Sequence, residues 1–271
     1  MPEFKLPDDI TEVKEINPTD LVILSVPKTG KTNILAELTK KQNAILFSLE
    51  RGGVDYVSGK FISIYPNDDT SFAEACENYK TWRDLLLKNK GKYKYLLVDG
   101  LSALDEMSEL MGTYYYMYSV PQGKNFNLNV KTGKYYEYGD DNFKLVTTLG
   151  EGYGYRYTRE WFMQQMNFFS EIAPYRIYSA HVKDKLIKNS QDEQVTGLEI
   201  NLTGKLKNIV SAKVSSLSKL VADGDKRYLS FEVDNENIIA GSRVPHLSGQ
   251  ILISEKLKDD TIKTYWENIY K

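Results

Sequence analysis

A stretch near the amino terminus carries the residue types that bind phosphate. Residues 25–32 read SVPKTGKT and follow directly on an apolar run. The phosphate-binding loop pattern is a Gly, four variable residues, and then Gly-Lys-Ser/Thr. Gly30, Lys31 and Thr32 match this pattern, whereas Ser25 stands in place of the first Gly. We therefore predict a nucleotide-binding loop at this position.

Each part of such a loop has a chemical role. Gly30 lets the backbone approach phosphate oxygens because it has no Cβ. Successive N–H groups and the amino end of the following helix form an anion cradle. Lys31 would reach the β- and γ-phosphates of ATP, and Thr32 would offer its hydroxyl to Mg²⁺. The alternative is a strand, a turn and a helix in which Gly-Lys-Thr occurs by chance. The residues expected to bind nucleotide are Ser25, Val26, Pro27, Lys28, Thr29, Gly30, Lys31 and Thr32.

A second signal is an acid at the end of an apolar segment. Residues 93–99 read YKYLLVD, which predicts a strand over 94–99 that ends at Asp99. We expect this strand to lie beside the strand of the phosphate-binding loop, where Asp99 would orient Mg²⁺ or a metal-bound water. The next residue is Gly100 and not an acid. The base that activates water must therefore come from elsewhere.

Glu50 is the candidate for that base. It follows the apolar segment 44–49 and precedes Arg51-Gly52-Gly53. We expect its strand to lie next to the phosphate-binding strand, where a carboxylate at the carboxyl end would face the γ-phosphate. There it would polarise the attacking water. The alternative is an exposed acid that caps a Gly-Gly turn.

A third strand end carries His181, which follows the apolar segment 176–180. A polar residue at this tip would sense the γ-phosphate through a hydrogen bond, although a structural histidine fits as well. Lys183 and Lys185 lie two residues apart and point the same way if the segment is extended. They would reach a neighbouring subunit's phosphates, as an arginine finger does, or they form a solvated basic turn.

Bulk properties exclude several classes of protein. The chain has 271 residues with a net charge of −2, so no global basic field indicates nucleic acid. The single cysteine, Cys76, rules out an internal disulfide and a Cys-based zinc site. There is no secretory signal and no long apolar span. We therefore expect a soluble, cytoplasmic protein without a membrane partner.

Short apolar runs alternate with helical patterns along the chain, which predicts an α/β fold. We expect one domain over 1–271, with a mostly parallel central sheet, helices on both faces and an antiparallel addition at the carboxyl end. The expected strands are 20–25, 43–48, 61–65, 94–99, 175–181, 215–222, 227–233 and 250–254. The expected helices are 31–41, 70–89, 100–118 and 156–173.

The segment 119–150 is an insertion rich in Gly, Asn, Lys and Tyr. Lys131-Thr132-Gly133-Lys134 is typical of a turn between two short strands, so we predict a β-hairpin. A surface hairpin is one interpretation. The other is a lid, or an interaction arm with stacking aromatic side chains.

In order along the chain, PKTGKT at 27–32, LERGG at 49–53, Asp99 and AHVK at 180–183 resemble the RecA-like ATPase core. More narrowly, the chain resembles phage AAA-type ATPases related to Sak-type single-strand annealing proteins. The resemblance covers roughly residues 15–245.

This resemblance implies hydrolysis of ATP with Mg²⁺ by a protein that acts on single-stranded DNA. The expected setting is phage-type recombination, annealing or replication in the host cytoplasm. Expected partners are further copies of the chain and phage replication or recombination proteins. Two alternatives stand: a nucleotide-binding interaction module with little hydrolysis, and a hexameric helicase-type motor.

The resemblance also places DNA contacts after His181, in the polar segment 186–213. An ordinary surface loop is the alternative. The lysines of this segment that would meet phosphates are Lys188, Lys205, Lys207 and Lys213. A second candidate is 153–157 with Arg156 and Arg159, which would otherwise pack onto the sheet. Arg243 is expected to return near the nucleotide.

Overall fold

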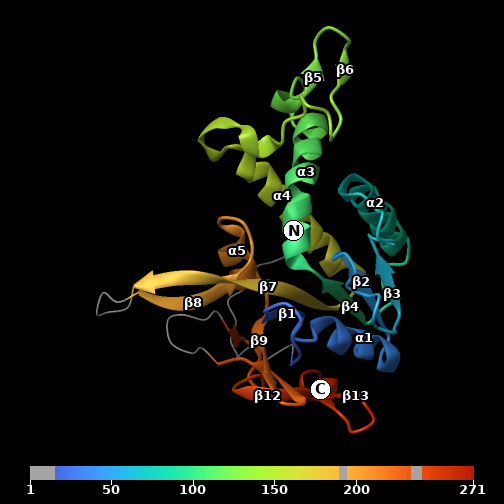
Figure 1. Cartoon of the computed structure of the whole chain (residues 1–271), viewed down its shortest axis with the longest axis vertical. Coiled ribbons are helices and arrows are strands. Elements are labelled where there is room, and N and C mark those ends of the chain that lie inside the picture. The colour runs from blue at the N-terminus through green and yellow to red at the C-terminus, as the bar shows by residue number, and fades with distance from the viewer. Residues whose placement is uncertain (1–15, 189–193, 233–239) are drawn as a thin grey trace, which may run out of the picture.

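Short apolar segments build the centre of a large β-sheet (Figure 1). The computed structural model describes residues 16–188, 194–232 and 240–271, without the side chains of 184–188 and 194–197. Eleven strands of the described residues join this sheet. They are β1 (Asp20–Ser25), β2 (Ala44–Ser48), β3 (Phe61–Ser63), β4 (Tyr95–Asp99), β7 (Tyr175–Lys188), β8 (Gln194–Ile200), β9 (Ser216–Asp223), β10 (Lys226–Ser230), β11 (Gly241–Ser242), β12 (Gln250–Lys256) and β13 (Ile262–Thr264).

The main path through the sheet has the order β13-β12-β10-β9-β1-β7-β4-β2-β3. The six strands from β9 to β3 run parallel to one another. The strands β10, β12 and β13 extend the sheet in antiparallel fashion. The prediction of a mostly parallel sheet with an antiparallel addition at the carboxyl end is therefore confirmed.

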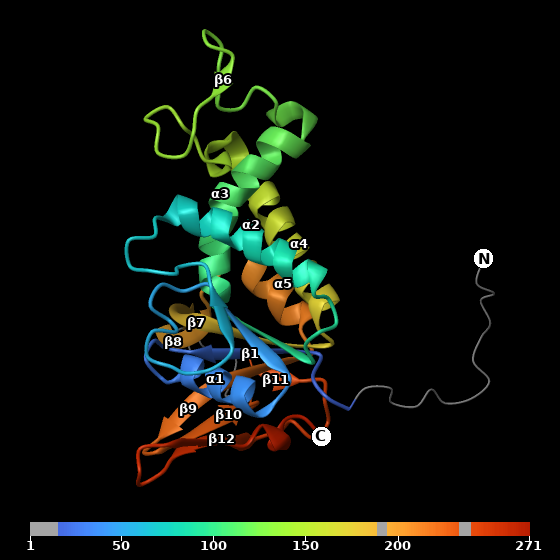
Figure 2. The same cartoon turned by 90° about the vertical axis from the view of Figure 1, so that its right-hand side faces the viewer.

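Helices cover both faces of the sheet. In the described residues these are α1 (Lys31–Lys41), α2 (Phe72–Lys88), α3 (Leu101–Ser119), α4 (Gly154–Ile172) and α5 (Leu206–Lys213). One face packs α1 and the last strands around Leu21 and Leu97. The other packs the remaining helices around Val22 and Phe47 (Figure 2). Alternate residues of one strand thus serve opposite cores, which explains the continuous apolar runs.

The strand order corrects two expectations. The sequence predicts β4 and β2 beside β1, but β7 lies between β1 and β4, and β2 lies beyond β4. Because β7 follows β1 by about 150 residues, no local pattern reveals this insertion. The register places Ser25 opposite His181, and Asp99 opposite Ser179 on the other edge of β7. The residue of β7 next to the phosphate-binding loop is therefore His181, which lies in the middle of this strand at the last pair with β1.

A nearly buried ion pair joins β1 to β7 at the end opposite the loop. Arg176 donates from Nη2 and Nε to the two carboxylate oxygens of Asp20, at 2.6 and 2.9 Å. The Tyr178 hydroxyl donates to Asp20 as well, and Arg176 also donates to the carbonyls of Ala173 and Pro174. A fully paired guanidinium of this kind fixes geometry more than it adds stability. It sets the register between the strands that carry Ser25 and His181.

Two segments, the insertion 119–150 and the segment 186–213, differ in how well their type was predicted. The insertion is mostly turns, with a short hairpin of β5 (Leu128–Asn129) and β6 (Lys134–Tyr135) beyond the far end of α3 (Figure 1). The segment 186–213 is not a plain loop: β7 runs on to pair with β8, and α5 follows. The predicted contact Lys188 lies outside the described side chains. In the described part of the chain, no helix has the length and apolar character needed to cross a bilayer.

Candidate nucleotide site

The loop between β1 and α1 has the shape of an anion cradle. Lys28 and Gly30 both have positive φ, at 65° and 95°, so the backbone turns sharply before the helix begins. Nothing lies within 4 Å of the position that a Cβ on Gly30 would take, which leaves open space above the loop. Val26, Pro27 and Lys28 are exposed, and the Thr29 hydroxyl donates to the Val26 carbonyl. The predicted binding residues therefore form one continuous turn.

Lys31 lies in the first turn of α1 and is only 7 % exposed. Its Nζ donates to Ser25 Oγ at 2.9 Å and lies 3.5 Å from Nδ1 of His181. The Thr29 hydroxyl donates to the same Ser25 oxygen at 2.6 Å. Ser25, which stands where the pattern has Gly, thus provides an acceptor for the ammonium group of Lys31.

Thr32 and Asp99 form a pair of oxygen ligands at the base of the loop. The Thr32 hydroxyl donates to Asp99 Oδ2 at 2.7 Å. The Ser179 hydroxyl donates to the other carboxylate oxygen, and it accepts from the Gly100 N–H at 2.9 Å. Asp99 is completely buried, and these partners fix its orientation. The two residues predicted to bind metal are therefore in direct contact.

Glu50 reaches the same site from the end of β2, although β2 lies two strands away from β7. Its Oε1 lies 3.0 Å from Nε2 of His181, without the alignment of a hydrogen bond. This oxygen is buried and has no hydrogen-bond partner among the described residues. A buried acceptor of this kind normally binds a donor. It is therefore suited to a water molecule.

The position of Glu50 explains why Gly follows Asp99. A Cβ on Gly100 would lie 2.8 Å from Glu50 Cγ and 3.2 Å from its Oε1. Gly100 also has φ of 114°, which side chains rarely tolerate. The second acid of the site therefore comes from β2 and occupies the space beside Gly100. Arg51, which follows Glu50, turns away and stacks over the Tyr65 ring at 4.5 Å.

The charges of the site depend on one another. Burial lowers the pKa of Lys31, while Glu50 and Asp99 oppose that shift. Burial raises the pKa of Asp99, and the charge of Glu50 adds to this. For Glu50, burial favours the neutral acid, but the contact with His181 and the charge of Lys31 outweigh it and hold the pKa below its usual value. One lysine thus faces two acids.

These residues fit Mg²⁺ bound together with a nucleotide. Two acids against one lysine leave an excess of negative charge that a cation would neutralise, and hydroxyl and carboxylate oxygens are its usual ligands. Within the described residues, no three His, Cys, Asp or Glu side chains are grouped to hold a metal alone. This is expected of Mg²⁺, which draws on phosphates and water. Thr32 and Asp99 would hold the ion.

The structure places the remaining predicted residues away from this cluster. Lys183 is 41 % exposed at its side chain, and its Nζ lies 3.7 Å from Glu199 Oε1 and 3.4 Å from the Leu202 carbonyl. Lys185 lies on the same strand, but its side chain is not among those described. The sequence predicts Arg243 near the nucleotide, but within one copy of the chain it lies far from the phosphate-binding loop. β11 pairs with the start of β9, so Arg243 lies at the opposite sheet end, bonded to the Ala212 carbonyl.

The sequence of the chain also matches a known protein family. The profile of the family described as AAA domain matches residues 17–244, which covers most of the chain and all of the clustered residues. The chain belongs to this family. The AAA domain assignment identifies an AAA-type P-loop ATPase, in agreement with the sheet and the phosphate-binding loop. No curated protein matches the chain.

Sequence reasoning missed several residues of this AAA domain. Ser179 orients Asp99, yet serine two residues before His181 carries no motif. The Ser102 hydroxyl, on the first turn of α3, donates to the carbonyl of Asn201 and accepts from the His181 N–H. Arg227 on β10 donates from Nε to the Thr29 carbonyl of the loop at 3.2 Å. These contacts join segments that are distant in the sequence, so no local pattern predicts them. The sequence indicates only those site residues that follow an apolar run.

We predict that Ser25→Ala tightens the binding of MgATP about fivefold. Lys31 must leave Ser25 Oγ before it reaches a phosphate, and a hydrogen bond contributes about 1 kcal/mol. Without the Ser25 hydroxyl, Lys31 gives up no hydrogen bond when it turns to the phosphate, and the backbone of the loop is kept. Titration with a fluorescent ATP analogue measures the difference. Weaker binding by the variant would instead mean that the hydroxyl contacts the nucleotide.

Proposed function

We propose that this protein hydrolyses ATP with Mg²⁺ at the loop Ser25–Thr32, and that it does so while acting on single-stranded DNA. The observation that carries the first part is the meeting of four elements. Thr32 contacts Asp99 at 2.7 Å, Glu50 lies 3.0 Å from His181, and Lys31 lies 3.5 Å from the same ring. Side chains separated by up to 150 residues share one small volume, and each has a use in phosphoryl transfer.

The proposed reaction is attack of water on the γ-phosphorus of ATP. A bond forms from the water oxygen to phosphorus and the bond to the β,γ-bridging oxygen breaks. The proton that the water loses passes by way of Glu50 to solvent, and ADP and phosphate leave. Glu50 accepts a hydrogen bond from the water and directs its oxygen, which its ionised carboxylate beside His181 supports. Lys31 stabilises the charge on the phosphates. When bound, Mg²⁺ would neutralise charge on the β- and γ-phosphates.

The nucleoside end of ATP has a cavity of its own on the other side of the loop. The acids and His181 lie on the β7 side of β1, so we propose that the base and ribose extend toward β10. A cavity of about 270 Å³ lies there between Gly30 and Ile34 on one side and Arg227 and Ile262 on the other. Its size suits one nucleoside. This gives the antiparallel addition a role in binding.

A second cavity supports the action on single-stranded DNA. It has about 340 Å³ and is lined by Tyr155 and Arg159 of α4 and by Gly204 and Lys205 before α5. No acid lines it. Neither Arg159 nor Lys205 has a side-chain hydrogen bond or ion pair within the described residues, and Tyr155 is 39 % exposed. Two unpaired cations beside an exposed ring are suited to the phosphates and bases of a single strand.

This cavity is connected to the nucleotide site through the chain that leaves His181. The Asn201 N–H donates to the His181 carbonyl at 2.8 Å, and the Asn201 carbonyl accepts from the Ser102 hydroxyl at 3.0 Å. The N–H of Thr203, two residues before Lys205, donates to Asp105 of α3. A phosphate held by Lys205 would therefore bias the position of His181. We propose this as the route by which DNA stimulates hydrolysis.

The setting we propose is phage-type recombination, annealing or replication, with copies of the chain assembled so that a neighbour's Lys183 or Lys185 completes the site. One observation favours a second function, a nucleotide-binding interaction module with little hydrolysis. The bond from Lys31 to Ser25 is a competitor for phosphate and would weaken ATP binding. A helicase-type motor has no specific observation in its favour. Turnover measured with and without single-stranded DNA separates the first two functions.

We predict that the double variant Arg159→Gln with Lys205→Gln loses stimulation of the ATPase by single-stranded DNA. Two lost phosphate contacts should also reduce the slope of log affinity against log salt by about 1.4, because each contact contributes about 0.7 on a single strand. The matched control is Lys90→Gln. Lys90 is a surface cation that lines neither this cavity nor the nucleotide site, and it pairs with Glu171 of α4 at 3.4 Å. Equal stimulation of the double variant and the control would place the DNA elsewhere.

A further inference from the structure

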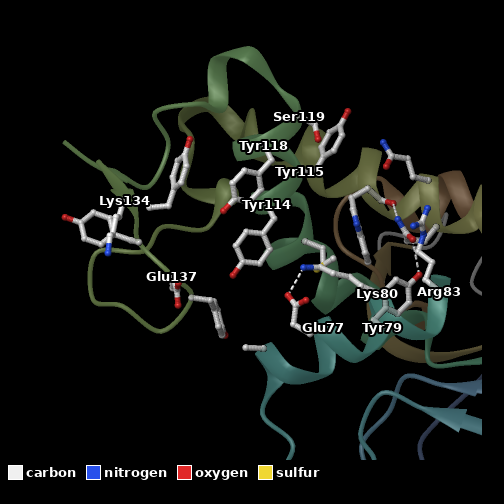
Figure 3. A pocket seen from close by; sticks show the side chains of 18 residues that line it. Glu77, Tyr79, Lys80, Arg83, Tyr114, Tyr115, Tyr118, Ser119, Lys134 and Glu137 are labelled. Atoms are coloured by element: carbon white, nitrogen blue, oxygen red, sulfur yellow. Dashed lines mark hydrogen bonds and ion pairs between the residues drawn. The ribbon is translucent and has the colours of Figure 1, made fainter. Parts of the chain in front are cut away.

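A large cleft with walls rich in tyrosine lies next to the insertion (Figure 3). It has about 930 Å³ and lies between α2, the last turns of α3, the middle of α4 and the residues around β6. We call it the tyrosine cleft. Its tyrosine side chains are Tyr79, Tyr114, Tyr115, Tyr118, Tyr135, Tyr136 and Tyr138. The cleft is not part of the nucleotide site, because α3 spans about 27 Å between Asp99 and its far end.

Two tyrosine side chains of the cleft are substantially exposed to solvent. Tyr118 is 66 % exposed and Tyr138 is 42 % exposed. The Tyr114 and Tyr118 rings are stacked on one face of α3, with centroids 6.2 Å apart, and Tyr135 of the hairpin meets Tyr118 edge-on at 5.6 Å. Figure 3 shows Lys134 and Glu137 facing the side chains of α2 across the opening. Rings held in this way form a platform for stacking.

The charged side chains that line the cleft are three cations and two acids, which favours an anionic ligand. Lys80 is already paired with Glu77 at 2.6 Å, which leaves Arg83 and Lys134 against Glu137. The Nε of Arg83 is buried and has no acceptor within the described residues, and its nearest acid is Asp84, at 3.8 Å from Nη1. A buried donor without an acceptor is costly. The Arg83 side chain as a whole is 41 % exposed, so a phosphate oxygen in the cleft would pair with the outer nitrogens of its guanidinium.

Two kinds of ligand use aromatic clefts of this size, and the charges distinguish them. A proline-rich peptide docks on aromatic rings and needs no cation. A single-stranded nucleic acid uses the rings for its bases and the cations for its phosphates. Arg83, which is 41 % exposed at its side chain and has only the distant and exposed Asp84 as an ion-pair partner among the described residues, favours the second. The cleft and the Arg159–Lys205 cavity also use different faces of α4, because Trp161 and Gln165 line the cleft and Arg159 lines the cavity.

We propose that the tyrosine cleft binds a short segment of single-stranded nucleic acid, with a base stacked on the exposed Tyr118 and a phosphate on Arg83. This inference rests on the proposed action on single-stranded DNA for the class of ligand. It adds a second strand site to the chain, separate from the Arg159–Lys205 cavity. A protein with two such sites holds two strands at once, as annealing requires.

The test is binding of a fluorescein-labelled 15-nucleotide oligothymidine, followed by anisotropy on the full chain that carries Arg159→Gln and Lys205→Gln. In this background we expect Tyr118→Ala to raise the dissociation constant at least about fivefold, because stacking of one base contributes about 1–3 kcal/mol. Tyr118→Phe keeps the ring and should stay within about twofold of its parent. Arg83→Gln should weaken binding and flatten its salt dependence.

The control for a general loss of exposed aromatic surface is Tyr56→Ala, since Tyr56 is 94 % exposed and lies outside the cleft. Equal affinities of Tyr118→Ala and Tyr56→Ala for the oligothymidine would overturn the proposal. So would tight binding of a proline-rich peptide by a protein that does not bind the oligothymidine. ATP turnover is measured in parallel. If turnover fails while the Tyr118 effect remains, the proposed ATPase is wrong and the strand site stands.

Discussion

Lys31→Ala is expected to reduce ATP turnover by at least about 10²–10³-fold. Lys31 is the buried cation of the cluster, and its Nζ lies between Ser25 and His181 with the two acids behind it. Loss of one preorganised charge at a developing phosphate charge costs about 2.7–4 kcal/mol in comparable sites. The variant also leaves Glu50 and Asp99 without their lysine. Nucleotide affinity should therefore fall together with the rate.

The measurement is phosphate release by the purified variant beside Lys40→Ala. Lys40 lies in the last turn of the same helix and pairs with Glu37 at the surface, so its loss tests only the general effect of removing a lysine from α1. Melting curves show whether each variant is folded. A folded Lys31→Ala protein with more than about a tenth of the normal rate would contradict the assignment of the phosphate site.

Glu50→Gln is expected to bind ATP normally and to lose at least about 10²-fold in turnover, the usual range for a missing general base. The amide has nearly the shape of the carboxylate, so the packing against Gly100 is kept. It lacks the charge and basicity that direct the water. Because the pKa of Glu50 is held below its usual value, the wild-type group is ionised at neutral pH. The expected loss therefore concerns chemistry and not the protonation state.

Single-turnover phosphate release and a fluorescent-nucleotide titration separate the two effects. Asp55→Asn is the matched control, since Asp55 is an exposed acid in the turn that follows Glu50. Normal single-turnover rates in Glu50→Gln would remove this residue from the mechanism. Loss of ATP binding in parallel with the rate would mean that Glu50 acts on the loop, through His181, and not on water.

Polar residues at the ends of apolar runs were predictable, and strand order was not. Glu50, Asp99 and His181 each follow a run that forms a buried strand, and the carboxyl ends of parallel strands meet at one edge. That rule brought them to the phosphate-binding loop. The rule holds for any order of the strands, so these three residues still lie close together although β7 lies between β1 and β4.

Features that depend on pairing between distant segments were out of reach. Arg243 follows a short stretch whose partner is the start of β9, and nothing in its own neighbourhood indicates which end of the sheet that is. The segment 186–213 reads as a polar loop, but it holds the end of β7 and the whole of β8, which pair with each other, and then α5. Gly100 follows Asp99 because the side chain of Glu50 occupies the space beside it. Glu50 lies 50 residues earlier, after the neighbouring strand β2.

The central claim is that the loop Ser25–Thr32 supports hydrolysis of ATP. The most direct test is steady-state phosphate release from ATP and Mg²⁺ by the full chain, with and without single-stranded DNA, beside Lys31→Ala prepared in the same way. We predict release by the wild type that rises with DNA and falls to background in the variant. Equal release by the two proteins, or none from the wild type in the presence of DNA, would contradict the claim.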